Sequence, residues 1–335
     1  MARKPHKDIA ADDTGYIAYM REEVSHFINL PHRTIRRVGD RKEWVDLPDT
    51  SPEEKLVRWF SHPAVLSTDY CRWVRECIKG KDWGRLCDAI WQYGRFCMLP
   101  GCSAGTPVYD IRFGMTGWAC NDASFFERCF PRTRTPFKSN LFLYCQLINF
   151  LLGLWYGRQE ILDAALPHAR RYLASKQPKK HRAEIGFLIA LVENRPDVAS
   201  EQLDTLCKLA PRGAIWETDE ELILCLHAHA LYELAWLRGP SGFAERIALP
   251  ERSNFCAPYA TWLAGHPEYR PSLYLTYPDD LEILNRILEA PIQRQVLAYK
   301  VFSDAPHARP ELIKDEEATL REFLRTIPTA VEKSH

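Results

Sequence analysis

The sequence predicts an all-α fold, an irregular array of helical hairpins similar in plan to tetratricopeptide repeats. Apolar residues recur at helical spacing in successive segments from Thr68 onward. Stretches that begin at Gly80, Gly157 and Asn194 each pass from a turn-forming residue beside a charge into an amphipathic segment, as expected where one helix ends and the next begins. The last two lie 37 residues apart, close to the tetratricopeptide period of about 34 residues.

Residues 1–66 are predicted to form a mixed, mainly helical N-terminal extension. We expect a helix from Tyr16 to Leu30, a polar stretch punctuated by prolines, and a short helix from Glu53 to Phe60. Eleven basic and eleven acidic side chains balance in this region. That balance favours a solvated outer layer over a binding arm.

Residues 67–330 are predicted to form the helical-repeat domain. A hairpin is expected on either side of Gly80, and two more are expected as the pairs 141–156 with 161–173 and 184–193 with 197–210. The helix after Glu221 is apolar on nearly every face, so it should run through the centre. Helices at 279–289 and 311–325 complete the domain.

An irregular insertion at 100–140 interrupts the hairpins. Its glycines and prolines predict either an excursion with a small strand at Val108–Phe113 or a functional insertion. GCSAG, residues 101–105, fits the G-x-S-x-G nucleophile elbow, which needs a strand before it and a helix after it. The expected helix before it favours a plain turn. An enzyme using Cys102, Ser103 or Asp110 remains the alternative.

Composition limits the cellular setting. Forty-four basic and forty-four acidic residues cancel, which argues against nucleic acid or an anionic membrane as the partner. The N-terminus has no apolar run of a secretory signal. The most apolar segment, 141–157, is about 17 residues long, short of the roughly 20 that a membrane span needs. Eleven cysteines with no CxxC pair predict reduced, packed thiols in a cytoplasmic protein.

Neither a cofactor nor a metal site is predicted. The chain has no phosphate-binding glycine loop, HExxH motif or EF-hand loop. His227 and His229 are two residues apart, so on a helix they point in opposite directions and cannot chelate one metal. The run from His168 to Arg182 has six lysines and arginines and no acid; it indicates a solvated helix end, with phosphate contact as the alternative.

Two segments have the composition of a protein interface. The acidic, tryptophan-bearing stretch 216–221 suits a basic partner, although acids at a helix start also serve as caps. The aromatic and proline-rich stretch 259–280 contains the residue types that dominate binding hot spots, although its rings could instead pin the segment onto the helices. The predicted partner-binding residues are Trp216, Glu217, Asp219, Glu220, Tyr269, Arg270, Tyr274, Tyr277, Asp279 and Asp280.

With the hairpins assembled, the chain resembles the all-helical immunity proteins of bacterial polymorphic-toxin and contact-dependent competition systems. The features that carry the resemblance are FLIALVENRPDVASEQLDTLCKLAP from Phe187, the apolar helix after Glu221, and PSLYLTYPDDLEILNRIL from Pro271. The resemblance implies a cytoplasmic, non-enzymatic protein that binds a cognate toxin domain and blocks its active site or substrate access. The sequence leaves open an enzyme with its site at 100–140, and a helical scaffold or regulator that binds a peptide or nucleic acid.

Overall fold

The main body of the fold is helical, as the predicted all-α class requires. The computed structural model describes residues 13–30, 33–38, 41–46, 50–59, 67–99, 107–134, 136, 143–210, 220–292, 294–300 and 311–328. The α-helices are α1 Asp13–Asn29, α2 Pro52–Trp59, α3 Ser67–Gly80, α4 Trp83–Met98, α5 Pro107–Trp118, α6 Ser124–Cys129, α7 Leu143–Tyr156, α8 Gln159–Ala174, α9 Lys179–Val192, α10 Pro196–Leu209, α11 Glu220–Ile223, α12 Leu226–Arg238, α13 Ala257–Gly265, α14 Glu282–Glu289 and α15 Glu316–Leu324. Two 3₁₀ turns, η3 Ala244–Arg246 and η4 Asp279–Leu281, join them.

Four helical hairpins share one kind of turn. A residue one to three positions after the end of the first helix has a positive φ in each: Lys81 at 55°, Asn121 at 58°, Gly157 at 63° and Asn194 at 53°. The next amide donates to the carbonyl five residues back, as in a Schellman cap. These bonds are Asp82 to Cys77 at 3.0 Å, and Asp122 to Gly117, Arg158 to Gly153 and Arg195 to Ala190, each at 2.8 Å. The hairpin turn therefore recurs, while the helices beside it differ in length; a regular repeat array stays a prediction.

The predicted strand at Val108–Phe113 is wrong, because these residues lie in α5. Glycines that indicated a loop instead allow α5 and α6 to pack closely. A Cβ on Gly117 would lie 2.3 Å from the carbonyl oxygen of Asp122, and one on Gly114 would lie 3.3 Å from the backbone of Phe126. The described part of 100–140 is thus a fourth hairpin.

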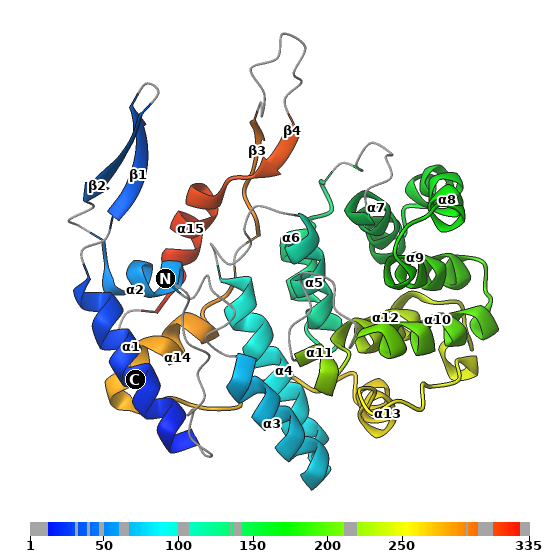
Figure 1. The fold of residues 1–335 in the computed structure, drawn as a ribbon, viewed down its shortest axis with the longest axis horizontal. Helices are drawn as coiled ribbons and strands as arrows, with labels where there is room; N and C mark the ends of the chain where they lie inside the picture. Colours follow the sequence, from blue (N-terminus) through cyan, green and yellow to red (C-terminus); the bar gives the residue numbers. More distant parts are fainter. Residues whose placement is uncertain are drawn as a thin grey trace.

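Two antiparallel strand pairs, which the sequence reading missed, lie at one edge of the helical body (Figure 1). β1, Arg33–Val38, pairs with β2, Arg41–Asp46, and β3, Leu297–Lys300, pairs with β4, Glu311–Lys314. The predicted helix at 311–325 is therefore partly wrong: its first four residues form β4. Asp315 caps α15 by accepting a hydrogen bond from the amide of Ala318 at 3.1 Å, which fixes the helix start after the strand.

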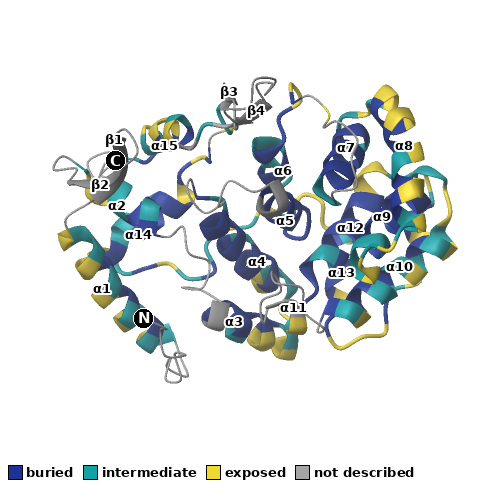
Figure 2. Cartoon of the chain, turned by 45° about the horizontal axis from the view of Figure 1, so that its top comes forward, coloured by how far each residue is buried: buried dark blue, intermediate teal, exposed yellow. Residues whose placement is uncertain are grey.

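One continuous hydrophobic core joins the N-terminal helices α1 and α2 to the rest of the chain. The single helix predicted after Glu221 is divided at residues 224–225 into α11 and α12. α12 is buried along most of its length, as expected of a central helix, while α8 exposes its outer face (Figure 2). The described cysteines are free thiols, and all but Cys256 are buried. Within the described ranges, no helix combines the length and apolar character that a membrane crossing requires.

Candidate protein-binding site

One face of α4 carries a polar stripe made of Arg85, Asp88, Gln92 and Arg95. The spacing of three and four residues puts all four on the same side of the helix. This side faces the chain that follows α13. We call residues 266–278, the extended segment between α13 and η4, the strap. Three of the four stripe residues contact the strap, and Arg95 contacts the C-terminal end of α14.

Asp88 and Gln92 hold the backbone of the strap. Asp88 Oδ1 accepts a hydrogen bond from the amide of Ser272 at 2.9 Å. Gln92 Oε1 accepts from the amide of Leu275 at 2.9 Å, and its Nε2 donates to the Leu275 carbonyl at 3.2 Å. A side-chain amide here satisfies both backbone groups of one residue, as a neighbouring strand would.

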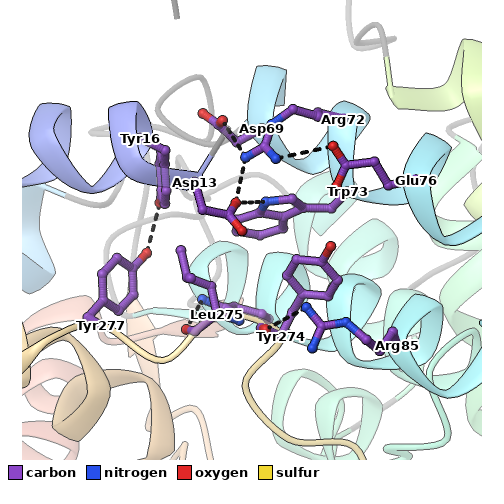
Figure 3. A network of polar contacts seen from close by, with 11 residues as sticks. Asp13, Tyr16, Asp69, Arg72, Trp73, Glu76, Arg85, Tyr274, Leu275 and Tyr277 are labelled. Carbon is purple, nitrogen blue, oxygen red and sulfur yellow. Dashed lines mark hydrogen bonds and ion pairs between the residues drawn. The ribbon is translucent and has the colours of Figure 1, made fainter. Parts of the chain in front are cut away.

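The ring of Tyr274 is clamped between α3 and α4. It stacks on Trp73 with centroids 4.8 Å apart, and the guanidinium carbon of Arg85 lies 4.1 Å from its centroid (Figure 3). Arg85 Nη2 also donates to the Tyr274 carbonyl at 3.3 Å. Both the ring and the backbone of this residue are therefore fixed.

Arg95 is a buried cation, only 3% exposed, at the end of the stripe. It donates to the carbonyls of Leu288, at 2.6 Å, and Ala290. Burial, together with the positive charge of Arg128, lowers the pKa of Arg95 to about 9. The guanidinium thus anchors the C-terminal end of α14 to α4.

Helix α1 closes the far side of this region. The hydroxyls of Tyr16 and Tyr277 are 2.8 Å apart (Figure 3). Asp13 Oδ1 accepts from Arg72 Nη2 at 2.6 Å and from Trp73 Nε1 at 3.1 Å. The strap is therefore enclosed by α1, α3 and α4.

The predicted aromatic residues of the strap pack inward. Tyr274 and Tyr277 are 7% and 2% exposed, and the Tyr269 hydroxyl donates to Asp88 Oδ1 at 3.1 Å. Arg270 is exposed and donates to the carbonyls of Pro267, at 3.0 Å, and Tyr269, at 3.1 Å. These rings contribute directly to the fold, and their part in binding a partner stays a prediction.

The predicted acidic residues are divided among three places. Asp280 forms an ion pair with Arg21 at 2.5 Å, with both side chains about half exposed. Asp279 is exposed at the start of η4. Glu220 is the first residue of α11. Trp216, Glu217 and Asp219 lie outside the described residues. Whether the two predicted segments act together in binding a partner stays a prediction.

A groove runs along the α9–α10 hairpin, with a cavity of about 370 Å³. Small residues of α9, Ala183, Gly186 and Ala190, form its floor. A Cβ on Gly186 would lie 3.0 Å from Gln202 Oε1 on α10, so glycine keeps the floor low at this point. The remaining lining residues are Leu173, Lys179, Arg182, Ile189, Glu193, Arg195, Val198, Gln202 and Thr205.

Basic side chains dominate the rim of this groove. Lys179 and Arg182 are at one end, and Arg195 is at the other. The acid of the rim, Glu193, is already paired with Arg170 at 2.6 Å and Arg195 at 3.8 Å. Arg182 Nε is buried and has no hydrogen-bond partner among the described residues. The basic run predicted from the sequence thus contributes two of its cations to the groove.

The two histidines of α12 occupy separate surroundings, as predicted. His227 Nδ1 lies 3.0 Å from Glu184 Oε1 on α9. His229 stacks on Phe255, with centroids 4.2 Å apart, and its Nε2 accepts from the Cys256 amide at 3.2 Å. Burial lowers the pKa of His229 to about 3. Across the described ranges, no group of three or more acids, histidines or cysteines is arranged to hold a metal.

The alternative enzyme site has little described structure. Cys102 and Ser103 lie outside the described residues, and Asp110 is buried in α5. α4, not a strand, ends at Met98 shortly before the GCSAG motif, and α5 begins at Pro107 after it. A nucleophile elbow requires the strand as well as the helix, so half of the required context is met.

Sequence reasoning missed both the stripe and the groove. Polar residues at positions 85, 88, 92 and 95 follow the same spacing as a buried apolar face, and this was a signal of a polar contact along α4. Small residues at 183, 186 and 190 likewise follow one face of α9. Neither pattern by itself says what lies opposite.

Comparison with protein-family models, with curated proteins and with solved structures finds no match for this chain.

Proposed function

We propose that this chain is a non-enzymatic protein-binding module, a cytoplasmic immunity protein that binds and neutralises a cognate bacterial toxin. The observation that carries the proposal is the open groove of the α9–α10 hairpin, with its apolar floor and basic rim.

The strap region supports the same proposal. There, helices of this chain already hold an extended segment by its backbone and by one clamped ring. Helical-hairpin scaffolds use such surfaces to bind other proteins. The pattern-level resemblance to helical immunity proteins gives the partner its identity as a toxin domain.

The test is recovery of the partner and an assay of its toxicity. The tagged chain is purified from its own cells, washed with 1 M salt and analysed by mass spectrometry. We expect one stoichiometric partner that stops growth when expressed alone in a heterologous host and is harmless when co-expressed with this chain. Recovery of the chain alone, or of a partner that is not toxic, would contradict the immunity proposal.

A further inference from the structure

We propose that the α9–α10 groove binds an acidic, partly apolar segment of the partner protein. This inference rests on the proposed function, since it names the site and the chemistry of the same interaction. Three features of the groove support it: its charge, its small-residue floor and the guanidinium of Arg182, which forms no ion pair with a described residue.

The charge of the groove selects an acidic ligand. Three basic side chains and one acid line it, and that acid, Glu193, already has two arginine partners. Neither Lys179 nor Arg182 forms an ion pair with a residue that the structure describes. The segment that leads into this end of α9 adds Lys176 and no acid. An anionic segment would therefore be attracted to the start of α9, where Lys179 and Arg182 lie.

Arg182 indicates where an acidic side chain of the partner would bind. Its Nε is buried without a hydrogen-bond partner in the described chain. A buried donor of a charged group gains most when an acceptor arrives, and a carboxylate can accept from a guanidinium through two parallel hydrogen bonds. Arg182 is partly exposed and lines the groove, so a glutamate or aspartate of the partner beside Lys179 would accept from the terminal nitrogens of its guanidinium.

The floor selects small apolar side chains for the rest of the segment. Ala183, Gly186 and Ala190 leave room above α9, while Ile189 and Val198 line the groove with branched apolar surface. From Lys179 to Glu193 the groove follows roughly 21 Å of helix, at about 1.5 Å per residue. That length accommodates about six residues of extended chain at roughly 3.3 Å each.

The residue types that line the groove argue for protein over nucleic acid. No tyrosine, tryptophan or phenylalanine is among the lining residues, whereas single-stranded nucleic acid is usually bound by aromatic stacking beside basic groups. The apolar floor suits aliphatic side chains, and the flat face of a base has no ring there to stack on.

The first arm of the test is a display library of random 15-residue peptides selected on the immobilised full-length chain. We expect enriched peptides with net negative charge. Their affinity should fall about tenfold or more on Lys179→Gln/Arg182→Gln, a change of about 1.4 kcal/mol or more. It should be unchanged on Lys79→Gln, which removes an exposed lysine of α3. Enrichment of neutral or basic peptides, no enrichment, or equal binding to both variants would overturn the proposal.

The second arm separates this inference from the proposed function. The charge-reversed variant Lys179→Glu/Arg182→Glu and the control Lys79→Glu are each used to recover the native partner. Loss of the partner with the first variant alone supports the groove. Equal recovery of the partner by both variants would overturn the assignment of the groove as the binding site and leave the proposed function intact. Failure of the wild-type chain to recover any partner would contradict the proposed function itself. Thermal unfolding checks that both variants fold, and tight binding of a 20-nucleotide single strand that depends on Arg182 would also overturn the proposal.

Discussion

The α4 stripe and the α9–α10 groove are two polar helix faces that differ in what covers them. Around α4, Asp88 and Gln92 have their hydrogen-bonding groups on the strap, and Arg95 donates to two backbone carbonyls. In the groove, Arg182 retains a buried donor with no partner in the described chain. The first face is completed by this chain itself, so its residues serve the fold. The second is open, so its residues are available to another molecule.

The largest expected effect is that of Arg95→Ala, which removes the buried cation of the completed face. Two buried carbonyls lose their donor and a cavity forms, so we expect a loss of about 3–5 kcal/mol in the free energy of unfolding. Urea denaturation measures it. Arg75→Ala, at an exposed position of α3, is the control and should change stability by less than about 0.5 kcal/mol. Equal effects would mean that the stripe does not stabilise the fold.

Glu233 is a buried carboxyl whose Oε2 has no hydrogen-bond partner among the described residues, and it tests how such a group changes stability with pH. It lies on α12, which packs against both α5 and α10, and burial raises its pKa from 4.5 to about 7. The folded form holds the proton of Glu233 more tightly than the unfolded form does. The stabilisation of the fold by this proton is therefore complete below pH 4.5 and is lost as pH rises through 7. The loss is on the order of 3 kcal/mol.

Glu233→Gln should remove this part of the pH dependence. Urea denaturation at pH 5 and pH 9 is expected to show wild type losing stability relative to the variant as pH rises. Glu245→Gln, at an exposed position, serves as the control and should follow wild type. Parallel pH profiles for Glu233→Gln and wild type would show that the carboxyl is not held in a desolvated site.

Gln92→Leu tests the hydrogen bonds to the strap at nearly constant side-chain size. The amide and carbonyl of Leu275 would both lose their partner, so we expect a loss of about 2 kcal/mol in the free energy of unfolding. Hydrogen exchange at the Leu275 amide should accelerate at the same time. Gln159→Leu, on the exposed start of α8, is the control. Unchanged exchange at Leu275 would contradict the role given to Gln92.

The smallest expected effect on stability is that of Arg182→Gln in the groove. Its buried Nε has no partner to lose, so the free energy of unfolding should change by less than about 0.5 kcal/mol. Chemical denaturation measures it. The difference between this small loss of stability and the large loss expected for Arg95→Ala measures how differently the two faces contribute to the fold. A loss above about 2 kcal/mol would place Arg182 in the fold and weaken its assignment to a partner.

Much of the fold could be predicted from the sequence because helical periodicity is a local signal. The turns at Lys81, Gly157 and Asn194 were visible as small or turn-forming residues beside charges. The glycines of α5 misled, because Gly117 is required by contact with Asp122 and Phe125 and not by a loop. Periodicity alone does not distinguish these two uses of glycine.

The candidate site was predicted less well because it depends on contacts between distant segments. Tyr274 and Tyr277 had the composition of an interface, and the structure buries them against α3 and α1. Composition cannot tell an aromatic ring that meets its own chain from one that meets a partner. The groove arises where Gly186 faces Gln202 across two helices, a pairing that no local pattern reports.

The most direct test of the central claim is hydrogen–deuterium exchange of this chain, alone and in its native complex. The measurement follows both faces in one experiment. We expect the partner to slow exchange in residues 179–205 and at the exposed edges of the groove, and to leave the Leu275 amide unchanged. Protection confined to the strap, or no protection at 179–205 in the complex, would contradict the assignment of the completed face to folding and the open face to binding.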